Sequence, residues 1–389
     1  MKKNRKIPCV YMRGGTSKAL FFHDKDLPSD AAERDRVILS AFGSPDRRQI
    51  DGMGGANTST SKVAVIRPSE RPGIDVDYDF GQVDINQPIV GKTMNCGNIS
   101  SAVGPFAIDE GLVEAVEPFT EVHIFNTNTQ KEIIEVVPVK DGMAVTEGDF
   151  AIDGVPGTGA KVTLKFVSPQ GAASGKLLPT GHPKDVIEVE GKRYEYSFVD
   201  AANPVIFVHP EDFGITGTEI PSVFHSRPDA EEICRILEII RGTGAIRLGF
   251  AKDLEDARIN SQTLPKIAFV TAPVDYTAGS GRAIGADQVD VVGRLFSVGM
   301  HMIDAYMGTG SICTMTAANT PGTLVNEIVC GGGKHPDNHA EHVRIGHPWG
   351  IIDVYADLED LPDGTHIVKS GNLDRTARRI MDGFVYVRE

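Results

Sequence analysis

Two residues of this sequence, Lys62 and Cys96, are the best placed to move a proton. Cys96 stands in Asn95-Cys96-Gly97-Asn98, just before a run of small residues that predicts a helix. A thiol at a helix N-terminus faces free backbone N–H groups and the positive end of the helix dipole, which favour its thiolate form. We therefore predict a reactive thiol at Cys96, although most free cysteines are small buried core residues.

Lys62 follows residues 51–61, which are rich in glycine and hydroxyl side chains, and it begins an apolar strand. Loss of water around a lysine there would favour the neutral amine, a candidate base, whereas a retained charge would steady a carboxylate or thiolate. The alternative is a lysine at a strand edge that extends to solvent. Lys266 begins a similar strand and is predicted to serve the other end of the same ligand.

Segments rich in backbone donors surround these residues and predict a site for carboxylates. Residues 13–18 form a turn between two strands and residues 308–311 open a second helix, so two helix N-termini would converge on one dianionic ligand. The alternatives are a plain hairpin at the turn and a core histidine at His301. The predicted binding residues are Arg13, Gly14, Gly15, Thr16, Ser17, Asn95, Gly97, Asn98, Lys266, His301, Gly308, Thr309 and Gly310.

The elements that carry these residues occur twice, in the same order. Each set has an apolar strand running into an acidic turn, a lysine-led strand closed by proline, and a helix of small residues behind a glycine-containing turn. Because chance similarity should not stay collinear, we predict two topologically similar domains. The paired segments are Ser17–Pro28 with Asn203–Gly214, Lys62–Pro68 with Lys266–Pro273, and Cys96–Val113 with Gly308–Val325.

A loop-forming stretch at residues 168–181 marks the boundary between the two sets. We predict an N-terminal domain of residues 1–184 and a C-terminal domain of residues 185–379, with a final strand at 380–389 that returns to the first domain. Apolar periodicity predicts helices over Asp229–Arg241 and Asp287–Tyr306.

Composition excludes several classes of function. The net charge of −14, from 53 acidic and 39 basic residues, would repel nucleic acid, and no apolar run is long enough to span a membrane. The basic start lacks the apolar stretch of a signal peptide, so a cytoplasmic enzyme is predicted, and homo-oligomers are common at this size. Five scattered cysteines without a C-x-x-C pair indicate neither disulfides nor zinc.

Three motifs suggest chemistry that their contexts do not support. Ser59-Thr-Ser-Lys62 fits a serine acyl-enzyme pattern but lacks its partner motifs, and Gly242–Arg247 is an incomplete dinucleotide motif that follows a helix. Four histidines gather in a loop rather than on a helix, so no metal is predicted, and no cofactor either. They are His335, His339, His342 and His347.

Taken together, the motifs resemble the PrpF family over nearly the whole chain. That family includes 2-methylaconitate isomerases, 3-methylitaconate delta-isomerases and 4-oxalomesaconate tautomerases. The resemblance implies a diaminopimelate epimerase-like α/β fold, in which two similar domains each wrap a curved, mostly antiparallel sheet around a central helix and the active site lies between them. The motifs are Met12–Lys18, Gly43–Asp46, Gln49–Ala56, Ser59–Lys62, Asn95–Asn98, Pro321–Asn326 and Arg344–Pro348.

The resemblance further implies Lys62 and Cys96 as the catalytic pair, with Ser17 and His301 completing the site. The expected reaction is a cofactor-free 1,3-allylic proton shift in a small unsaturated di- or tricarboxylate, and which of the two residues is the base stays open. Residues 126–129, 153–157 and 202–204 are most similar to the methylitaconate branch. The favoured substrates are therefore 3-methylitaconate with 2,3-dimethylmaleate, or 2-methylaconitate, with 4-oxalomesaconate as the alternative.

Two other functions are the alternatives to this allylic isomerisation. A two-base epimerase needs a second thiol at the start of the second helix, but Gly308 and Thr309 stand there and Cys313 lies more than a turn deeper. A non-catalytic protein that closes on a carboxylate would not explain a lysine directed at a thiol on a helix N-terminus.

Overall fold

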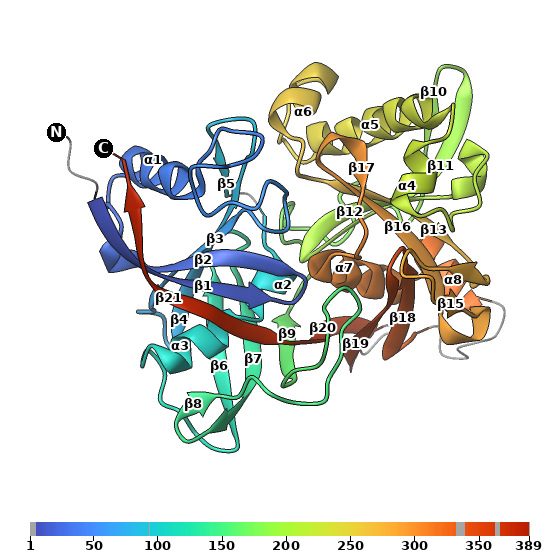
Figure 1. Ribbon diagram of the computed structural model, residues 1–389. Coiled ribbons are helices and arrows are strands. Elements are labelled where there is room, and N and C mark those ends of the chain that lie inside the picture. Colours follow the sequence, from blue (N-terminus) through green and yellow to red (C-terminus); the bar gives the residue numbers. More distant parts are fainter. Residues whose placement is uncertain (1–4, 93, 332–338, 362–365, 389) are drawn as a thin grey trace. The chain divides into compact units, whose positions relative to one another are not determined.

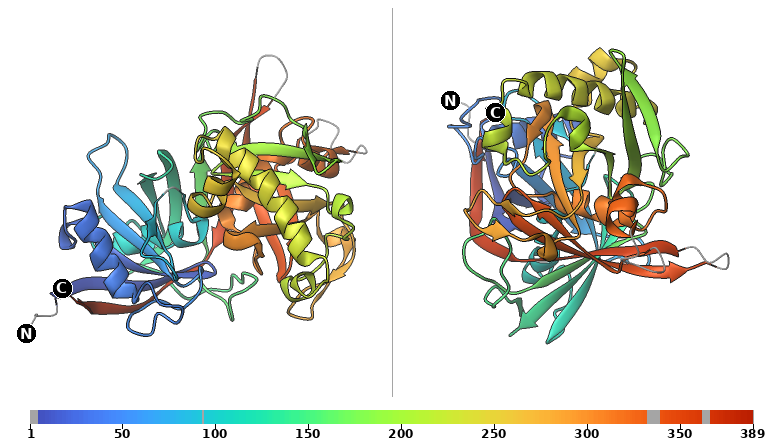
Figure 2. Two further views of the ribbon diagram at one scale, coloured as in Figure 1. Left: turned by 90° about the horizontal axis from the view of Figure 1, so that it is seen from above. Right: turned by 90° about the vertical axis from the view of Figure 1, so that its right-hand side faces the viewer.

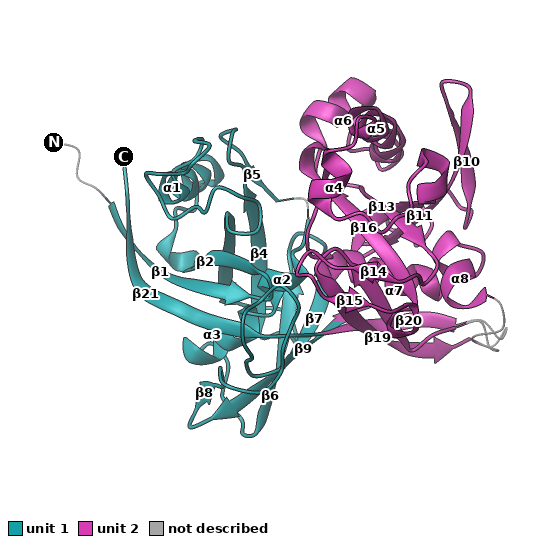
Figure 3. Ribbon diagram, turned by 45° about the vertical axis from the view of Figure 1, so that its right-hand side comes forward, with its two compact units in different colours: residues 1–165, 374–389 teal, residues 166–373 magenta. Residues whose placement is uncertain are grey.

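The computed structural model describes residues 5–92, 94–331, 339–361 and 366–388 (Figure 1). It divides into two compact units, one of residues Met1–Lys165 with Asp374–Glu389 and one of residues Phe166–Leu373 (Figure 3). The first boundary thus falls at residue 165 rather than at 184. The reason is Asp200, whose carboxylate accepts hydrogen bonds from the backbone N–H groups of Ala173 and Ser174 and so fixes the expected linker on the second unit.

The first unit is an antiparallel-rich sheet with helices on both faces. Its helices are α1 (Ala31–Phe42), α2 (Gly97–Ser100) and α3 (Val103–Asp109). Its strands are β1 (Arg5–Gly14), β2 (Ser17–His23), β3 (Lys62–Pro68), β4 (Val76–Val83), β5 (Val90–Gly91), β6 (Phe119–Asn126), β7 (Lys131–Lys140), β8 (Met143–Ala144), β9 (Val162–Val167, which ends in the second unit) and β21 (Ala377–Val387).

The two faces of this sheet follow from the alternation of side chains along β2 and β3. Leu20 and Val63 belong to the apolar cluster that includes α1. The residues that alternate with them along each strand point to the opposite face. There the ring of Phe21 lies 5.4 Å from that of Phe106 on α3. Lys62 is on this second face, the one covered by α2 and α3.

The second unit repeats the arrangement with longer helices. Its helices are α4 (Pro221–His225), α5 (Ala230–Arg247), α6 (Leu254–Asn260), α7 (Gly308–Ala318) and α8 (Leu324–Val329). Its strands are β10 (Asp185–Val189), β11 (Lys192–Ala201), β12 (Asn203–Val208), β13 (Lys266–Thr271), β14 (Tyr276–Thr277), β15 (Ala283–Ile284), β16 (Val291–Ser297), β17 (His301–Met302), β18 (His342–His347), β19 (Gly350–Asp360) and β20 (His366–Arg375, which ends in the first unit).

The predicted duplication is confirmed by the strand register. In the first unit β2 pairs in parallel with β3, so that Ala19 is opposite Lys62, and in the second β12 pairs in parallel with β13, so that Val205 is opposite Lys266. Each lysine-led strand then pairs antiparallel with the next long strand, which pairs in parallel with a third. Helix α5 lies along the outer side of its sheet (Figure 2), whereas every residue of α7 is buried.

The helix predicted over Asp287–Tyr306 is wrong. This segment holds β16 and the short strand β17, with a single 3₁₀ turn between them. All but the last residue of β16 are buried, Arg294 included, so the strand lacks the alternation of buried and exposed residues that would distinguish it from a buried helix. The other predicted helix, Asp229–Arg241, is confirmed as α5.

The C-terminal strand β21 runs antiparallel beside β1, from Arg5 opposite Val387 to Gly14 opposite Ala377 (Figures 1 and 2). The first unit is therefore built from both ends of the chain. Among the described residues, no helix is long and apolar enough to cross a membrane.

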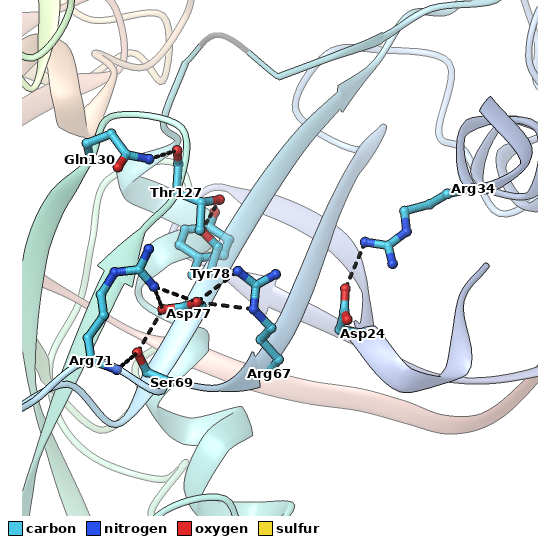
Figure 4. A network of polar contacts seen from close by, with 9 residues as sticks. All are labelled: Asp24, Arg34, Arg67, Ser69, Arg71, Asp77, Tyr78, Thr127 and Gln130. Atoms are coloured by element: carbon cyan, nitrogen blue, oxygen red, sulfur yellow. Dashed lines mark hydrogen bonds and ion pairs between the residues drawn. The ribbon is translucent and has the colours of Figure 1, made fainter. Parts of the chain in front are cut away.

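A buried aspartate fastens the start of β4 (Figure 4). Asp77, 5% exposed, accepts hydrogen bonds from Arg67 at 2.8 Å and Arg71 at 2.7 Å, and also from Ser69 at 2.9 Å. The two arginines reach it from the loop and strand that precede β4, so the ion pairs hold the β3–β4 connection in place.

We predict that Asp77→Ala lowers the free energy of unfolding by about 1–3 kcal/mol, because three donors lose their acceptor. Urea unfolding followed by circular dichroism would measure the change. The matched control is Glu33→Ala, which removes an exposed ion pair with Arg5 and should cost less than about 1 kcal/mol. Equal losses in the two variants would contradict the interpretation.

Candidate active site

Cys96 is the N-cap residue of α2, as its position in the sequence predicts. Its backbone is extended, and its N–H donates to Asn95 Oδ1 at 2.7 Å. The same amide oxygen accepts from Ser100 Oγ and from Asn126 Nδ2. Asn95 is 2% exposed. The Asn95 side chain therefore holds the first residues of the helix in place and fixes the position of the Cys96 backbone.

The predicted turn at residues 13–18 lies against this helix start. An added Cβ would approach Asn98 O to 2.4 Å at Gly14 and Asn98 Oδ1 to 2.2 Å at Gly15, so no side chain fits at either position. Asn98 Nδ2 donates to Thr16 Oγ1 at 3.0 Å. Arg13 Nη1 donates to the carbonyl oxygens of Gly15 and Thr376 at 3.0 and 2.8 Å. The turn is thus held from both sides.

Helices α2 and α3 follow one another and together are called the central helix of the first unit. They run in the same direction as β2, and this brings Lys62 toward the start of α2. Near the beginning of the helix Asn98 contacts Thr16, and further along Phe106 contacts Phe21, four residues into β2. Since Lys62 is opposite Ala19 at the beginning of β3, the lysine and the helix N-terminus lie at the same end of one sheet face.

The ammonium group of Lys62 is held by a glutamine that the sequence analysis missed. Lys62 is 6% exposed, and its Nζ donates to Gln82 Oε1 at 2.6 Å. Gln82 Nε2 donates in turn to the carbonyl oxygens of Thr58 and Ser61, at 3.2 and 3.0 Å, which fixes the orientation of the amide. Lys62 Nζ also lies 5.3 Å from the centroid of the Phe80 ring.

Alternate residues of β4 connect the lysine with the cysteine. Tyr78, Phe80 and Gln82 share one face of the strand, and the rings of Tyr78 and Phe80 lie 6.5 Å apart, edge to face. Burial raises the pKa of Tyr78 well above its usual value, and the nearby charge of Cys96 raises it further. The phenol is therefore a neutral neighbour of the thiol at one end of this row, and Lys62 is at the other end.

A buried carboxyl group lies beneath the central helix. Glu135 on β7 is 0% exposed and accepts from the Gly104 N–H at 2.9 Å. Among the described residues, its Oε1 is buried without a hydrogen-bond partner. Burial raises the pKa of Glu135 well above its usual value, which favours the protonated form. Its position between Ile133 and Val137 in an alternating strand was a signal available in the sequence.

In the second unit, the structure brings two of the predicted residues, Lys266 and His301, near one another. Lys266 Nζ donates to Ser297 Oγ at 3.5 Å, and Ser297 is opposite His301 in the β16–β17 pair. The ring of His301 stacks on that of His225 at 5.1 Å and 3°. His225 Nε2 accepts from the Met302 N–H at 3.2 Å, and burial together with the charge of His301 lowers the pKa of His225.

The first turn of α7 holds Gly308, Thr309 and Gly310, all buried. Thr309 Oγ1 accepts from Asn203 Nδ2 at 2.7 Å. Asn203 is the first residue of β12. Ser17, which is 4% exposed, is the corresponding first residue of β2. The structure thus fastens the second helix start to its adjacent strand, as it does in the first unit.

Cys313 lies inside α7 and is 0% exposed. Its thiol donates to the Val199 carbonyl oxygen at 3.3 Å, and burial raises its pKa. It is a core residue. Among the described residues, no three histidine, cysteine or acidic side chains gather to hold a metal ion, and His335 lies outside the described residues.

The family model of the PrpF protein matches residues 4–388. The chain belongs to the PrpF family. It is 48% identical over its full length to 3-methylitaconate isomerase of Eubacterium barkeri, covering 99% of that protein. It is 41% identical to 2-methyl-aconitate isomerase of Shewanella oneidensis and 37% identical to 4-oxalomesaconate tautomerase of Pseudomonas putida, covering 98% of this chain in both cases and 97% and 96% of those proteins.

Solved structures agree with the fold. The crystal structure of methylitaconate-delta-isomerase is similar with a TM-score of 0.81 at 47% identity, covering 99% of this chain and 96% of that one. A hydroxyproline epimerase from Agrobacterium vitis shares the fold, with a TM-score of 0.58 at 12% identity over 100% of this chain and 95% of that one. The predicted family, the epimerase-like fold and the isomerase class are confirmed.

Glu135 allows a prediction about stability and pH. Its pKa in the unfolded chain is near 4.5 and its pKa in the folded protein is higher, so between these values the folded state binds more protons and the free energy of unfolding falls as pH rises. Glu135→Gln removes this titration. The stability of the variant relative to the wild type should therefore rise as the pH increases above about 4.5, by up to about 1.4 kcal/mol per pH unit, until the folded carboxyl group titrates.

Thermal unfolding at a series of pH values would measure the difference. Glu132→Gln on the same strand, a half-exposed residue paired with His123, is the control. A difference for Glu135→Gln that stays constant with pH would contradict a raised pKa of the buried carboxyl group.

Proposed function

We propose that this protein catalyses a 1,3-allylic proton shift in a small unsaturated polycarboxylate, with Lys62 and Cys96 as the catalytic pair. The favoured reaction interconverts 3-methylitaconate and 2,3-dimethylmaleate, and 2-methylaconitate is the second candidate. The observation that carries the proposal is the placement of a buried lysine and a thiol on a helix N-terminus at one end of the same sheet face. The 48% identity to a 3-methylitaconate isomerase supports this choice of substrate.

In the proposed reaction, a base removes the proton from the saturated carbon next to a carboxylate, and the electrons of that C–H bond form a dienolate. The proton then returns to the terminal carbon of the former double bond, so a new C–H bond forms there and the double bond moves by one position. The negative charge that develops on the carboxylate would be stabilised by backbone N–H groups at helix starts and by a positively charged lysine side chain. No electrons are gained or lost.

The residue roles follow from the groups available. Gln82 holds Lys62 by its amide oxygen, which leaves the other N–H bonds of the ammonium group for the substrate. Residues Gly14–Ser17 with Gly97 and Asn98 are proposed to hold one carboxylate. Lys266, His301 and the first turn of α7, residues Gly308–Gly310, are proposed to take another. Whether the Cys96 thiolate or the Lys62 amine is the base stays open.

Other chemistries fit less well. Tautomerisation of 4-oxalomesaconate uses the same proton shift and is the nearest alternative, supported by the 37% identity to such a tautomerase. Two-base epimerisation is disfavoured because the thiol of α7, Cys313, is buried and donates to a carbonyl oxygen. A cytoplasmic location and assembly into homo-oligomers stay predictions from the sequence.

The substrate assignment can be tested by ultraviolet spectroscopy. Purified protein without added metal or nucleotide should change the absorbance of 3-methylitaconate, and more slowly that of 2-methylaconitate or 4-oxalomesaconate, because the double bond enters or leaves conjugation. In D₂O the product should carry deuterium at the carbon that receives the proton. Neither turnover nor exchange with any of the three compounds would refute the proposed function.

The catalytic pair can be tested by substitution. Cys96→Ala and Lys62→Ala should each lower kcat by about 10³-fold or more, since each removes a group that handles the proton or its charge. Cys313→Ala is the matched control, a thiol in the corresponding helix that should change kcat less than about threefold while lowering thermal stability. A large loss of kcat in Cys313→Ala would instead favour a two-thiol epimerase.

A further inference from the structure

We propose that Arg375 is a positioning residue which, acting through Asn98, orients the Thr16 hydroxyl as a hydrogen-bond donor to a substrate carboxylate. This inference rests on the proposed function for the identity of the ligand and adds a residue that the sequence analysis did not select. All three residues belong to the first unit.

Arg375 is a buried cation at the end of β20. It is 6% exposed, its Nε donates to Asn98 Oδ1 at 3.2 Å, and its Nη1 donates to the Asp374 carbonyl oxygen at 2.8 Å. Within the part of the chain that the structure describes, it forms no ion pair. The nearby Asp374 carboxylate is occupied by Thr163 at 2.6 Å and by Lys161 at 3.2 Å.

Burial of a cation without a carboxylate partner is unfavourable, and it lowers the pKa of Arg375 to about 10. The guanidinium is still protonated at neutral pH. An apolar side chain would avoid this cost. We therefore expect Arg375 to contribute through its charge or through its N–H donors. In a chain of net charge −14, it also provides positive potential where an anionic ligand would otherwise be repelled.

The donors of Arg375 set the direction of the hydrogen bonds that follow. Arginine has no acceptor, so the Asn98 side chain must present its oxygen to Arg375 and its nitrogen to Thr16. Asn98 Nδ2 then donates to Thr16 Oγ1 at 3.0 Å. A hydroxyl that accepts from Asn98 cannot also donate to it, so its own hydrogen is directed elsewhere. Arg375 therefore decides which group is the donor at Thr16.

The backbone around Thr16 leaves little freedom for another arrangement. Gly15 has a φ of 50° and an added Cβ there would lie 2.2 Å from Asn98 Oδ1, so the turn is in direct contact with the amide that orients the hydroxyl. The Gly15 N–H also donates to the Thr376 carbonyl oxygen at 2.9 Å, one residue after Arg375. Thr16 itself is half-buried, and Asn98 follows Cys96 by two residues. The directed hydroxyl is thus adjacent to the helix start that carries the thiol.

A double-mutant cycle tests the relay. Thr16→Val and Arg375→Met should each weaken binding of a carboxylate ligand by about tenfold, as expected for one hydrogen bond to a charged group, and the double variant should be no weaker than either single variant. Binding of maleate, measured by calorimetry, reports this without turnover. KM for 3-methylitaconate should rise by the same factor, while kcat changes less than about threefold.

Asn98→Asp separates the relay from a structural role. An aspartate accepts from Arg375 and also from the Thr16 hydroxyl, which turns the hydroxyl away from the ligand, so affinity should fall about tenfold although the buried cation gains a partner. Thr16→Ser restores a hydroxyl at this position and should therefore rescue the affinity that Thr16→Val loses. Thermal unfolding shows whether each variant is folded.

The outcomes separate the two proposals. Additive effects in the cycle, or unchanged maleate affinity in Asn98→Asp, would overturn the relay even when turnover is normal. Absence of maleate binding to the wild-type protein would also overturn it. A wild-type protein that binds maleate with the predicted coupling but turns over none of the unsaturated acids would refute the proposed function and leave the relay supported.

Discussion

The first unit depends on a contact that only glycine permits. The turn at Gly14 and Gly15 lies so close to Asn98 that a single added carbon would overlap its oxygen atoms. This approach places the start of α2, and with it Cys96, directly over the junction between β1 and β2. The parallel pairing of β2 with β3 then brings Lys62 to the same end of the sheet. A larger residue in the turn would separate the helix from the hairpin and move both candidate catalytic groups apart.

The second unit keeps the scaffold and changes the chemistry. In each unit the second strand of the parallel pair begins with a buried lysine. Each lysine donates a hydrogen bond to a polar residue on the neighbouring strand, Gln82 in the first unit and Ser297 in the second. The helix starts differ more. Cys96 is the N-cap residue of the first helix, whereas Met307 is the N-cap residue of the second, whose thiol, Cys313, is buried by packing. Duplication thus explains the position of the polar residues, and substitution at a few of them gives the two halves different roles.

Much of the fold and of the candidate site could be predicted, because the sequence signals for them lie close together along the chain. The helix N-terminus at Cys96, the lysine-led strands and the collinear repeats are each visible within about twenty residues of sequence. The helix expected over Asp287–Tyr306 was wrong because a strand buried on both faces loses its alternation. The unit boundary shifted because a single carboxylate, that of Asp200, ties down an otherwise loop-like segment. Gln82 could not be found, since its role depends on a strand register that the sequence does not state.

Arg375 was beyond sequence reasoning for a related reason, because its partner Asn98 is distant along the chain and nothing local marks the pair. Its location has a consequence for how the protein is made. The second unit is a single continuous segment, whereas the first combines residues up to Lys165 with residues from Asp374 onward and so includes β21 and Arg375. Because a chain is made from its N-terminus, the strand beside β1 and the buried cation near the thiol are added after every residue of the second unit. Until they are made, Lys62 and Cys96 belong to an incomplete sheet.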